Sequence, residues 1–249
     1  MLKKLYDKSK SWFAVAWIIA YCVLMSVGDS LSETIGIEKI VTLPIGFLLS
    51  SLLLLFLKKN NLFEAYGLCR SKAPAKSTLY YMPVILMLTA NLWYGVSFHV
   101  SVGETILYIL TMFCVGFLEE VIFRGLLFNA MRKDSVKSAI IVSSITFGIG
   151  HIINLFNGSG AELVPNLLQV IYATAAGFMF VMLYFKTGSL LACIGAHGLF
   201  NALSVFSNEM VQTTQTRILT CVLLTVITGG YALYLALKMV NPQKEKTVE

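Results

Sequence analysis

Charged side chains are scarce in this sequence. Only 13% of the residues are Asp, Glu, Lys or Arg, about half of the share in a soluble domain. Hydrophobic residues make up 57% of the chain, and the mean hydropathy is +0.77. This composition excludes a soluble globular protein and predicts a polytopic membrane protein.

The sequence also lacks the spacings that mark zinc knots and disulfide frameworks. Its five cysteines show no CxxC or similar pattern, and four lie in apolar runs, where cysteine usually acts as a small hydrophobic residue. None of the three histidines belongs to an HExxH motif, which would indicate a zinc protease. The net charge of +6 is carried by clusters between apolar segments, so it does not indicate nucleic-acid binding.

Eight segments are long and apolar enough to be membrane helices, which need about 20 residues. They are approximately 12–28, 40–57, 79–98, 105–131, 137–155, 165–185, 188–206 and 217–239. The first follows four lysines, as in a signal peptide, but no convincing small-x-small cleavage site follows it, so we expect a membrane helix. We therefore expect an all-α polytopic membrane helix bundle of about eight transmembrane helices. It would be a single integral-membrane domain over 1–249, with its motif core at about 104–206.

Basic and acidic residues alternate along the connections between these segments. One set of connections, together with the two chain ends, holds 16 of the 19 basic residues. These are Lys3, Lys4, Lys8, Lys10, Lys58, Lys59, Arg70, Lys72, Lys76, Arg132, Lys133, Lys137, Lys186, Lys238, Lys244 and Lys246. The other connections hold Asp29, Glu33, Glu38, Glu104, Glu162 and Glu209, with only Lys39 and Arg217. The positive-inside rule then predicts that both termini are cytoplasmic, in what looks like a bacterial plasma membrane protein.

Two adjacent carboxylates and an arginine interrupt the apolar pattern of the fourth segment. Glu119 lies about 18 Å from the cytoplasmic end of this helix, near the middle of a core about 30 Å thick. Ionisable groups at that depth indicate a functional site. Glu120 and Arg124 are one helical turn apart and can form an ion pair, which is either purely structural or orients Glu120 to support a site electrostatically. Glu119 points about 100° away without a local cation, so it is the candidate general base for water.

Two later segments carry three further polar side chains. His151 follows Phe147 by one helical turn, and His197 and Asn201 lie one turn apart on one face. Small residues surround them, namely Gly148, Gly150, Gly195, Ala196 and Gly198. Such residues let membrane helices approach closely. We therefore expect a polar cavity formed by the fourth, fifth and seventh segments, with an access gap toward the cytoplasmic leaflet or the bilayer.

These side chains supply the groups that peptide hydrolysis by water requires. The reaction needs a base, a group that holds the water and donors for the oxyanion. We assign Glu119 as the base, with His151 helping to hold and polarise the water. His197 and Asn201 would donate hydrogen bonds to the oxyanion.

Three motifs follow one another along the chain, namely Glu119-Glu120-x-x-x-Arg124, Phe147-x-x-x-His151 and His197-x-x-x-Asn201. Together they resemble the signature of the CPBP (CAAX-processing and bacteriocin-processing, or Abi) family of intramembrane proteases. The resemblance covers about 117–201, and no signature position departs from it. It implies an endopeptidase, which in eukaryotic members cleaves prenylated CAAX carboxyl termini, with catalytic roles for the paired Glu, the two His and the Asn. The expected partners are a membrane-associated or lipidated substrate and the lipid bilayer, with no nucleic acid.

The sequence leaves the role of a metal open. Glu119, His151 and His197 could bind zinc and leave a position for water. However, each of the two helices offers one His, and Asn201 is a poor zinc ligand, so we favour a mechanism without a cofactor. The family's usual label is nevertheless metalloprotease.

Two functions of other classes compete with a protease. Buried Glu and His could form the proton relay of a proton-coupled transporter, although no repeat symmetry is visible. A non-catalytic membrane scaffold or immunity protein is the other alternative. Replacing Glu119 or His151 separates these functions, because a scaffold should tolerate the change and a protease should not.

Overall fold

The computed structural model describes residues 2–157 and 160–238, so the expected basic residues Lys244 and Lys246 lie outside the described part. Within these ranges the regular elements are helices, apart from an isolated bridge between Val96 and Ser207. The all-α class is therefore confirmed. The short α1 (Leu2–Lys8) precedes the first long helix.

Six helical stretches of the described residues are long and apolar enough to cross a membrane. They are α2 (Lys10–Ile35); α3 (Thr42–Lys59); Val102–Met131, made of α5 (Val102–Glu119), η3 (Glu120–Phe128) and α6 (Asn129–Met131); Val136–Leu155, made of α7 (Val136–Gly150) and η4 (His151–Leu155); α8 (Leu163–Thr187); and α10 (Thr214–Lys238). The chain is thus a multi-pass membrane protein.

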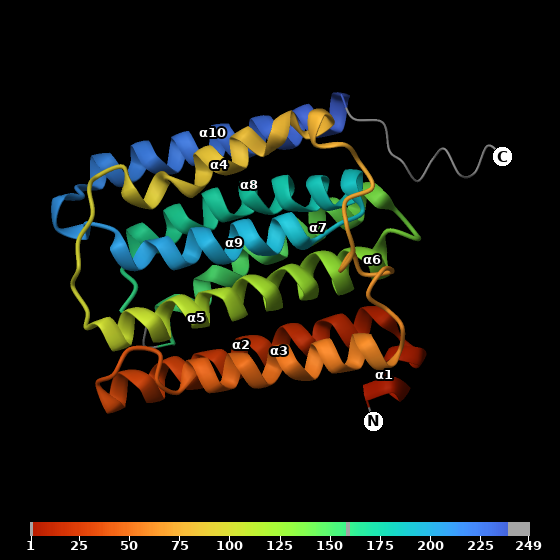
Figure 1. The fold of residues 1–249 in the computed structure, drawn as a ribbon, viewed down its shortest axis with the longest axis horizontal. Coiled ribbons are helices and arrows are strands. Elements are labelled where there is room, and N and C mark those ends of the chain that lie inside the picture. Colours follow the sequence, from red (N-terminus) through yellow and green to blue (C-terminus); the bar gives the residue numbers. More distant parts are fainter. Residues whose placement is uncertain (1, 158–159, 239–249) are drawn as a thin grey trace.

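Two of the eight expected membrane helices are not formed as long helices. The segment expected at 79–98 contains η1 (Ala75–Tyr81), α4 (Met82–Leu88) and η2 (Ala90–Leu92). The cause is local, because Leu79, Tyr80 and Tyr81 have φ values of 50°, 51° and 60°, which a right-handed helix excludes. The segment expected at 188–206 contains the shorter α9 (Leu191–Leu203) and η5 (Ser204–Phe206). Both still run lengthwise through the bundle, with α4 beside α10 (Figure 1).

The two ends of the bundle differ in charge. At one end, which we call the basic end, the connections 60–74, 132–135 and 188–190 meet the start of α2 and the end of α10 (Figure 1). Backbone hydrogen bonds of 2.8 Å join Lys72 to Thr187 and Leu190 to Gly67 there. At the opposite, acidic end, the connection 36–41 meets the start of α5, where Glu38 N donates to Glu104 Oε1 at 3.1 Å. The charges are therefore segregated as the alternation of the connections predicts.

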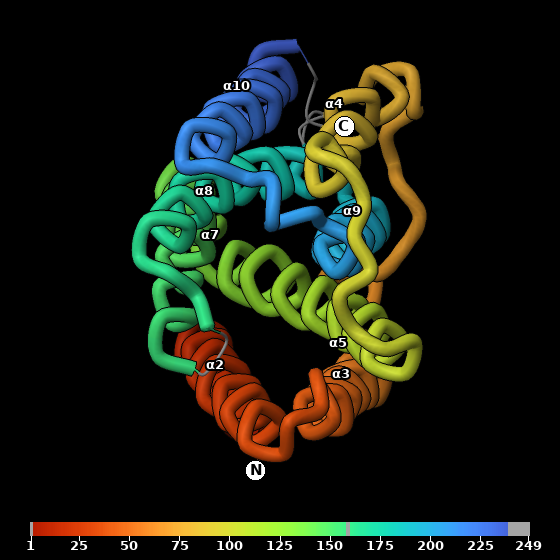
Figure 2. Tube along the Cα trace, turned by 90° about the vertical axis from the view of Figure 1, so that its left-hand side faces the viewer, coloured from red at the N-terminus to blue at the C-terminus, as the bar shows by residue number. Residues whose placement is uncertain are grey.

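The rod formed by α5 and η3 runs through the middle of the bundle. Figure 2 views the bundle from the acidic end, with α2 and α3 on one side of this rod and α8, α9 and α10 on the other. The twelve largest fully buried side chains lie level with Glu119 or nearer the basic end. We call this set the basic-end core; it comprises Arg124, Phe13, Phe128, Phe180, Leu53, Leu57, Leu118, Ile122, Leu126, Met179, Leu183 and Leu190. The half of the bundle near the basic end is therefore the more densely packed half.

Glycines allow close helix contacts at two points beside the expected motifs. A Cβ added to Gly116 on α5 would come within 2.5 Å of the backbone nitrogen of Gly198 on α9. A Cβ added to Gly148 on α7 would lie 2.8 Å from Thr174 Cα on α8. The close approach predicted at Gly148 and Gly198 is confirmed. It is wrong at Gly150 and Gly195, where an added Cβ meets nothing within 4 Å.

We expect Gly148→Ala to lower the stability of the protein and Gly150→Ala to leave it unchanged or slightly raised. The first variant forces α7 away from the backbone of Thr174, and overpacking of this kind costs about 1–3 kcal/mol. The second adds a methyl group to open space and improves helix propensity. Thermal unfolding of the two proteins in the same detergent measures the difference. Equal transition midpoints would contradict the close packing of α7 on α8.

Candidate active site

The adjacent carboxylates lie where the α-helix changes to a π-helix. Glu119 ends α5, and Glu120 begins η3, whose nine residues are all buried. In a π-helix the backbone hydrogen bonds run from i to i+5, and such stretches occur frequently at functional sites. The apolar pattern of this segment predicts a regular α-helix, and nothing in the sequence signals the change.

Glu120 is fully buried and lies between two cations or potential cations. Its Oε1 lies 3.1 Å from Arg124 Nη1 and 2.8 Å from His197 Nδ1. The predicted pair between Glu120 and Arg124 is confirmed as an ion pair, although its geometry is not that of a hydrogen bond. The guanidinium carbon also lies 4.0 Å from the ring centroid of Phe147. Arg124 is thus held by charge and by an aromatic face, since its nitrogens have no hydrogen-bond partner among the described residues.

Glu119 has partners that the sequence analysis did not anticipate. The hydroxyl of Tyr21, on α2, donates to Glu119 Oε1 at 2.6 Å. The other oxygen, Oε2, lies 3.3 Å from His197 Nε2. The side chain nevertheless lines a cavity of about 260 Å³, whereas Glu120 does not. Of the two carboxylates, Glu119 is therefore the one placed to meet a water or a substrate.

His197 connects the two carboxylates, with one ring nitrogen toward each. Its ring stacks on Phe180 at 5.7 Å and meets the edge of Phe147 at 5.5 Å. When protonated, His197 brings the positive charges to two, equal to the charges of the two carboxylates. This balance matters because an uncompensated charge in a low-dielectric interior is costly.

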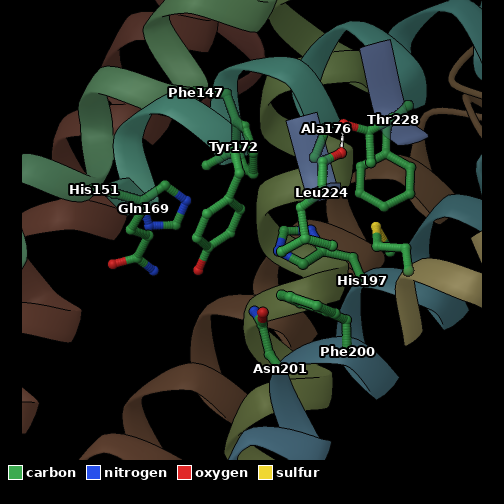
Figure 3. A pocket seen from close by; sticks show the side chains of 13 residues that line it. Phe147, His151, Gln169, Tyr172, Ala176, His197, Phe200, Asn201, Leu224 and Thr228 are labelled. Carbon is green, nitrogen blue, oxygen red and sulfur yellow. Dashed lines mark hydrogen bonds between the residues drawn. The ribbon is translucent and has the colours of Figure 1, made fainter. Parts of the chain in front are cut away.

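The cavity beside Glu119, which we call the central cavity, gathers most of the expected site. Its lining includes Phe147, His151 and Asn201 as well as Glu119. A smaller neighbouring cavity of about 30 Å³ is lined by His151, His197 and Asn201 and has room for about one water molecule. Figure 3 shows His151 and Asn201 on either side of Tyr172 in this smaller cavity. The structure therefore brings the three motifs together.

Helices beyond the three that we expected contribute to the site, among them α2 and α8. Tyr21 comes from α2, and Gln169 and Tyr172 come from α8. Gln169 Oε1 accepts a hydrogen bond of 3.3 Å from Asn154 Nδ2. The sequence has 11 tyrosines, and no motif distinguishes Tyr21 or Tyr172 from those at membrane interfaces.

We expect Tyr21→Phe to lower kcat about tenfold, the effect of losing about 1.4 kcal/mol from a hydrogen bond to a charged group. KM should change little, because the hydroxyl contacts Glu119 and the rest of the ring is kept. Steady-state kinetics of peptide cleavage separates the two constants. Tyr80→Phe is the matched control, since Tyr80 is 65% exposed. A raised KM with unchanged kcat would instead assign Tyr21 to substrate binding.

The alternative zinc ligands do not form a ligand shell in this arrangement. In the described part of the chain, no group of three or more His, Cys, Asp or Glu side chains is placed to hold a metal ion. Both nitrogens of His197 face carboxylates. The ring of Phe147 packs edge-on against both His151 and His197, at 5.3 and 5.5 Å. The set of Glu119, His151 and His197 therefore does not fit a tetrahedral zinc site as it stands.

The comparison with known proteins agrees with the motifs. The family model described as type II CAAX prenyl endopeptidase Rce1-like matches residues 101–203, a range that contains the three motifs. No curated protein and no solved structure matches the chain. The resemblance to the CPBP (Abi) proteases is confirmed for this range. Residues 101–203 thus belong to the Rce1-like type II CAAX prenyl endopeptidase family, which is a family of proteases.

Proposed function

We propose that this protein is an intramembrane endopeptidase. It hydrolyses a peptide bond of a membrane-associated or lipidated protein or peptide, using water activated by Glu119. The observation that carries the proposal is the position of Glu119, which faces the central cavity while Tyr21 donates a hydrogen bond to one of its oxygens and His197 Nε2 lies 3.3 Å from the other. A fixed carboxylate beside a cavity is the arrangement that a general base requires.

The reaction needs one proton acceptor and one stabilised oxyanion. Glu119 takes a proton from the attacking water while the water oxygen bonds to the carbonyl carbon and the carbonyl oxygen becomes the oxyanion. The carbonyl then re-forms as the carbon–nitrogen bond breaks, and the proton passes from Glu119 to the leaving amine. Asn201 lines the same cavity and can donate to the oxyanion from there. For His197 to share that role, as the sequence analysis expected, Nε2 would have to turn away from Glu119.

The remaining site residues support this pair in our proposal. His151 lines the central cavity and helps to hold the water. Glu120, paired with Arg124, holds the orientation of His197 from the buried side. Phe147 covers the guanidinium and packs against both histidine rings.

We further propose eight membrane crossings within a single integral-membrane domain over 1–249, with both termini in the cytoplasm of a bacterial cell. The α2 start and the α10 end lie together at the basic end (Figure 1), which supports an even number of crossings. The segments around α4 and α9 would complete the count. The 16 residues of Leu191–Phe206 reach about 24 Å at 1.5 Å per residue. This length is shorter than that of a usual membrane helix, but neighbouring helices pack along the segment.

Peptide cleavage by the purified protein in detergent tests the function, with Glu119→Ala and His197→Ala beside the wild type and with and without a strong chelator. We expect both variants to lose activity and the chelator to have no effect. His99→Ala is the matched control for His197→Ala, because His99 is exposed. If the chelator abolished the activity and zinc restored it, Glu119, His151 and His197 would instead be assigned as metal ligands. If the wild type and all the variants showed the same trace of peptide cleavage, the protease proposal would be removed. A scaffold would then be favoured, or a transporter if pH-dependent flux is found.

A further inference from the structure

The central cavity extends from Glu119 toward the acidic end. Its lining includes Tyr21, Cys22, Met25, Ser26 and Asp29 of α2, which share one face of that helix because they recur at three- and four-residue spacings. The nine residues from Tyr21 to Asp29 extend about 12 Å along the helix. The same cavity is lined by polar side chains of other elements near that end, namely Lys39, Thr42, Tyr108, Asn154, Asn157 and Ser204.

The charges at this end of the cavity are already paired. Asp29 Oδ1 accepts hydrogen bonds from Lys39 Nζ at 2.9 Å and from Thr42 Oγ1 at 2.8 Å. Burial alone would lower the pKa of Lys39, but the attraction and hydrogen bond of Asp29 outweigh burial and raise that pKa. Both side chains remain partly exposed. Because these two charges pair with each other, this end of the cavity can hold water without binding a separate counter-ion.

The opposite direction is closed by apolar packing. The basic-end core includes Phe13 on α2 and Leu53 and Leu57 on α3, all with no exposed surface. Phe13 also contacts the rings of Tyr6, Trp17 and Phe56. A core at this density leaves no voids for a chain of waters. Water can therefore reach Glu119 more easily from the acidic end than from the basic end.

We propose that the central cavity takes its water and its substrate from the acidic end, which is the non-cytoplasmic side of the membrane. This inference rests on the proposed peptidase function and topology, in which the basic end is cytoplasmic. The sequence predicts an access gap toward the cytoplasmic leaflet or the bilayer, and the outer access that we propose replaces the first of these two alternatives.

The proposal defines a class of substrate. The scissile bond must reach Glu119 past Asp29 and Lys39, along walls that include Met25, Met112 and Val115. A peptide that is exported, or that emerges from the bilayer on the outer side, has a hydrated segment next to an apolar one. The hydrated segment would lie at the polar end of the cavity, and the apolar segment would lie along the apolar walls. The substrate class is therefore an exported or membrane-spanning peptide, rather than a lipidated carboxyl terminus that stays in the cytoplasm.

Thiol labelling tests the direction of access without requiring catalysis. The two proteins compared retain either Cys22, which lines the central cavity, or Cys69, which lies at the basic end and donates to the carbonyl of Gly188; the other four cysteines become Ala. A permanently charged methanethiosulfonate is added to right-side-out or to inside-out membrane vesicles. We expect Cys22 to react about tenfold faster in right-side-out vesicles. Cys69 should react faster in inside-out vesicles and so reports the orientation.

A second variant keeps the test decisive if a thiol reacts slowly with the reagent for reasons other than access. Ser26→Trp, in the Cys22 protein, places a large ring in the cavity between Cys22 and Asp29 and should suppress labelling from outside. Faster labelling of Cys22 in inside-out vesicles, no labelling from either side, or labelling unaffected by Ser26→Trp would each overturn the proposal.

An impermeant quenched peptide added to the same vesicles then tests the function separately. Outside labelling without cleavage would refute the peptidase alone, and cleavage only in inside-out vesicles would refute the outer access alone.

Discussion

Glu119→Gln is expected to lower kcat for peptide cleavage by about 10²–10⁴-fold, with little change in KM. The amide keeps the size of the side chain and can still accept the hydrogen bond from Tyr21. It cannot take a proton from water, so the loss falls on the chemical step. Initial rates over a range of peptide concentrations give both constants, and thermal unfolding of each preparation confirms that it is folded.

The control for this change is Glu33→Gln, which alters an exposed carboxylate on α2 and should keep the wild-type kcat. Glu120→Gln provides a sharper comparison, because Glu120 does not line the central cavity. If Glu120→Gln abolished activity while Glu119→Gln did not, the two carboxylates would have to exchange the roles that we propose. If neither changed kcat, the reaction would not use a carboxylate base at this site.

Arg124→Met is expected to destabilise the protein by about 3–5 kcal/mol, the usual cost of removing one partner from a buried ion pair. Both members of the pair are fully buried, so the carboxylate of Glu120 would remain with only His197 as a potential counter-charge. Methionine fills much of the volume of the arginine stem, which separates the charge effect from a cavity effect. Unfolding in detergent, followed by the loss of helical signal with temperature, measures the change.

The double variant Glu120→Gln with Arg124→Met should recover part of this loss, because no uncompensated charge then remains. Arg70→Met is the control, since Arg70 is an exposed residue at the basic end and its loss should change stability by about 0.5 kcal/mol or less. A loss for Arg124→Met no greater than that of Arg70→Met would mean that the ion pair contributes nothing to stability.

Local features of the chain were the ones that sequence reasoning could predict. The span Val102–Met131 was predicted at 105–131 because apolar length is read directly from sequence. The ion pair of Glu120 and Arg124 was predicted because both lie within one helical turn. The alternation of loop charge likewise needs no tertiary information, and it anticipated the two ends of the bundle.

Features that depend on distant contacts could not be predicted in the same way. Tyr21 and Glu119 are 98 residues apart, and no spacing rule connects them. His197 was expected to face the oxyanion, but its ring faces two carboxylates because α5 and α9 touch at Gly116 and Gly198. The break at Leu79 arises from backbone angles that the apolar composition of 79–98 conceals.

The packing at the basic end also has a consequence for the electrical insulation of the membrane. A hydrated cavity that reaches Glu119 shortens the insulating layer to the part of the bundle filled by Phe13, Leu53 and Leu57. The membrane voltage then falls mainly across that apolar part, at about 2.3 kcal/mol per charge for 100 mV. In the proposed reaction, the proton that passes from water through Glu119 to the leaving amine stays on the cavity side of this voltage drop. The apolar packing at the basic end would thus keep the hydrated cavity that we propose from becoming a leak across the membrane.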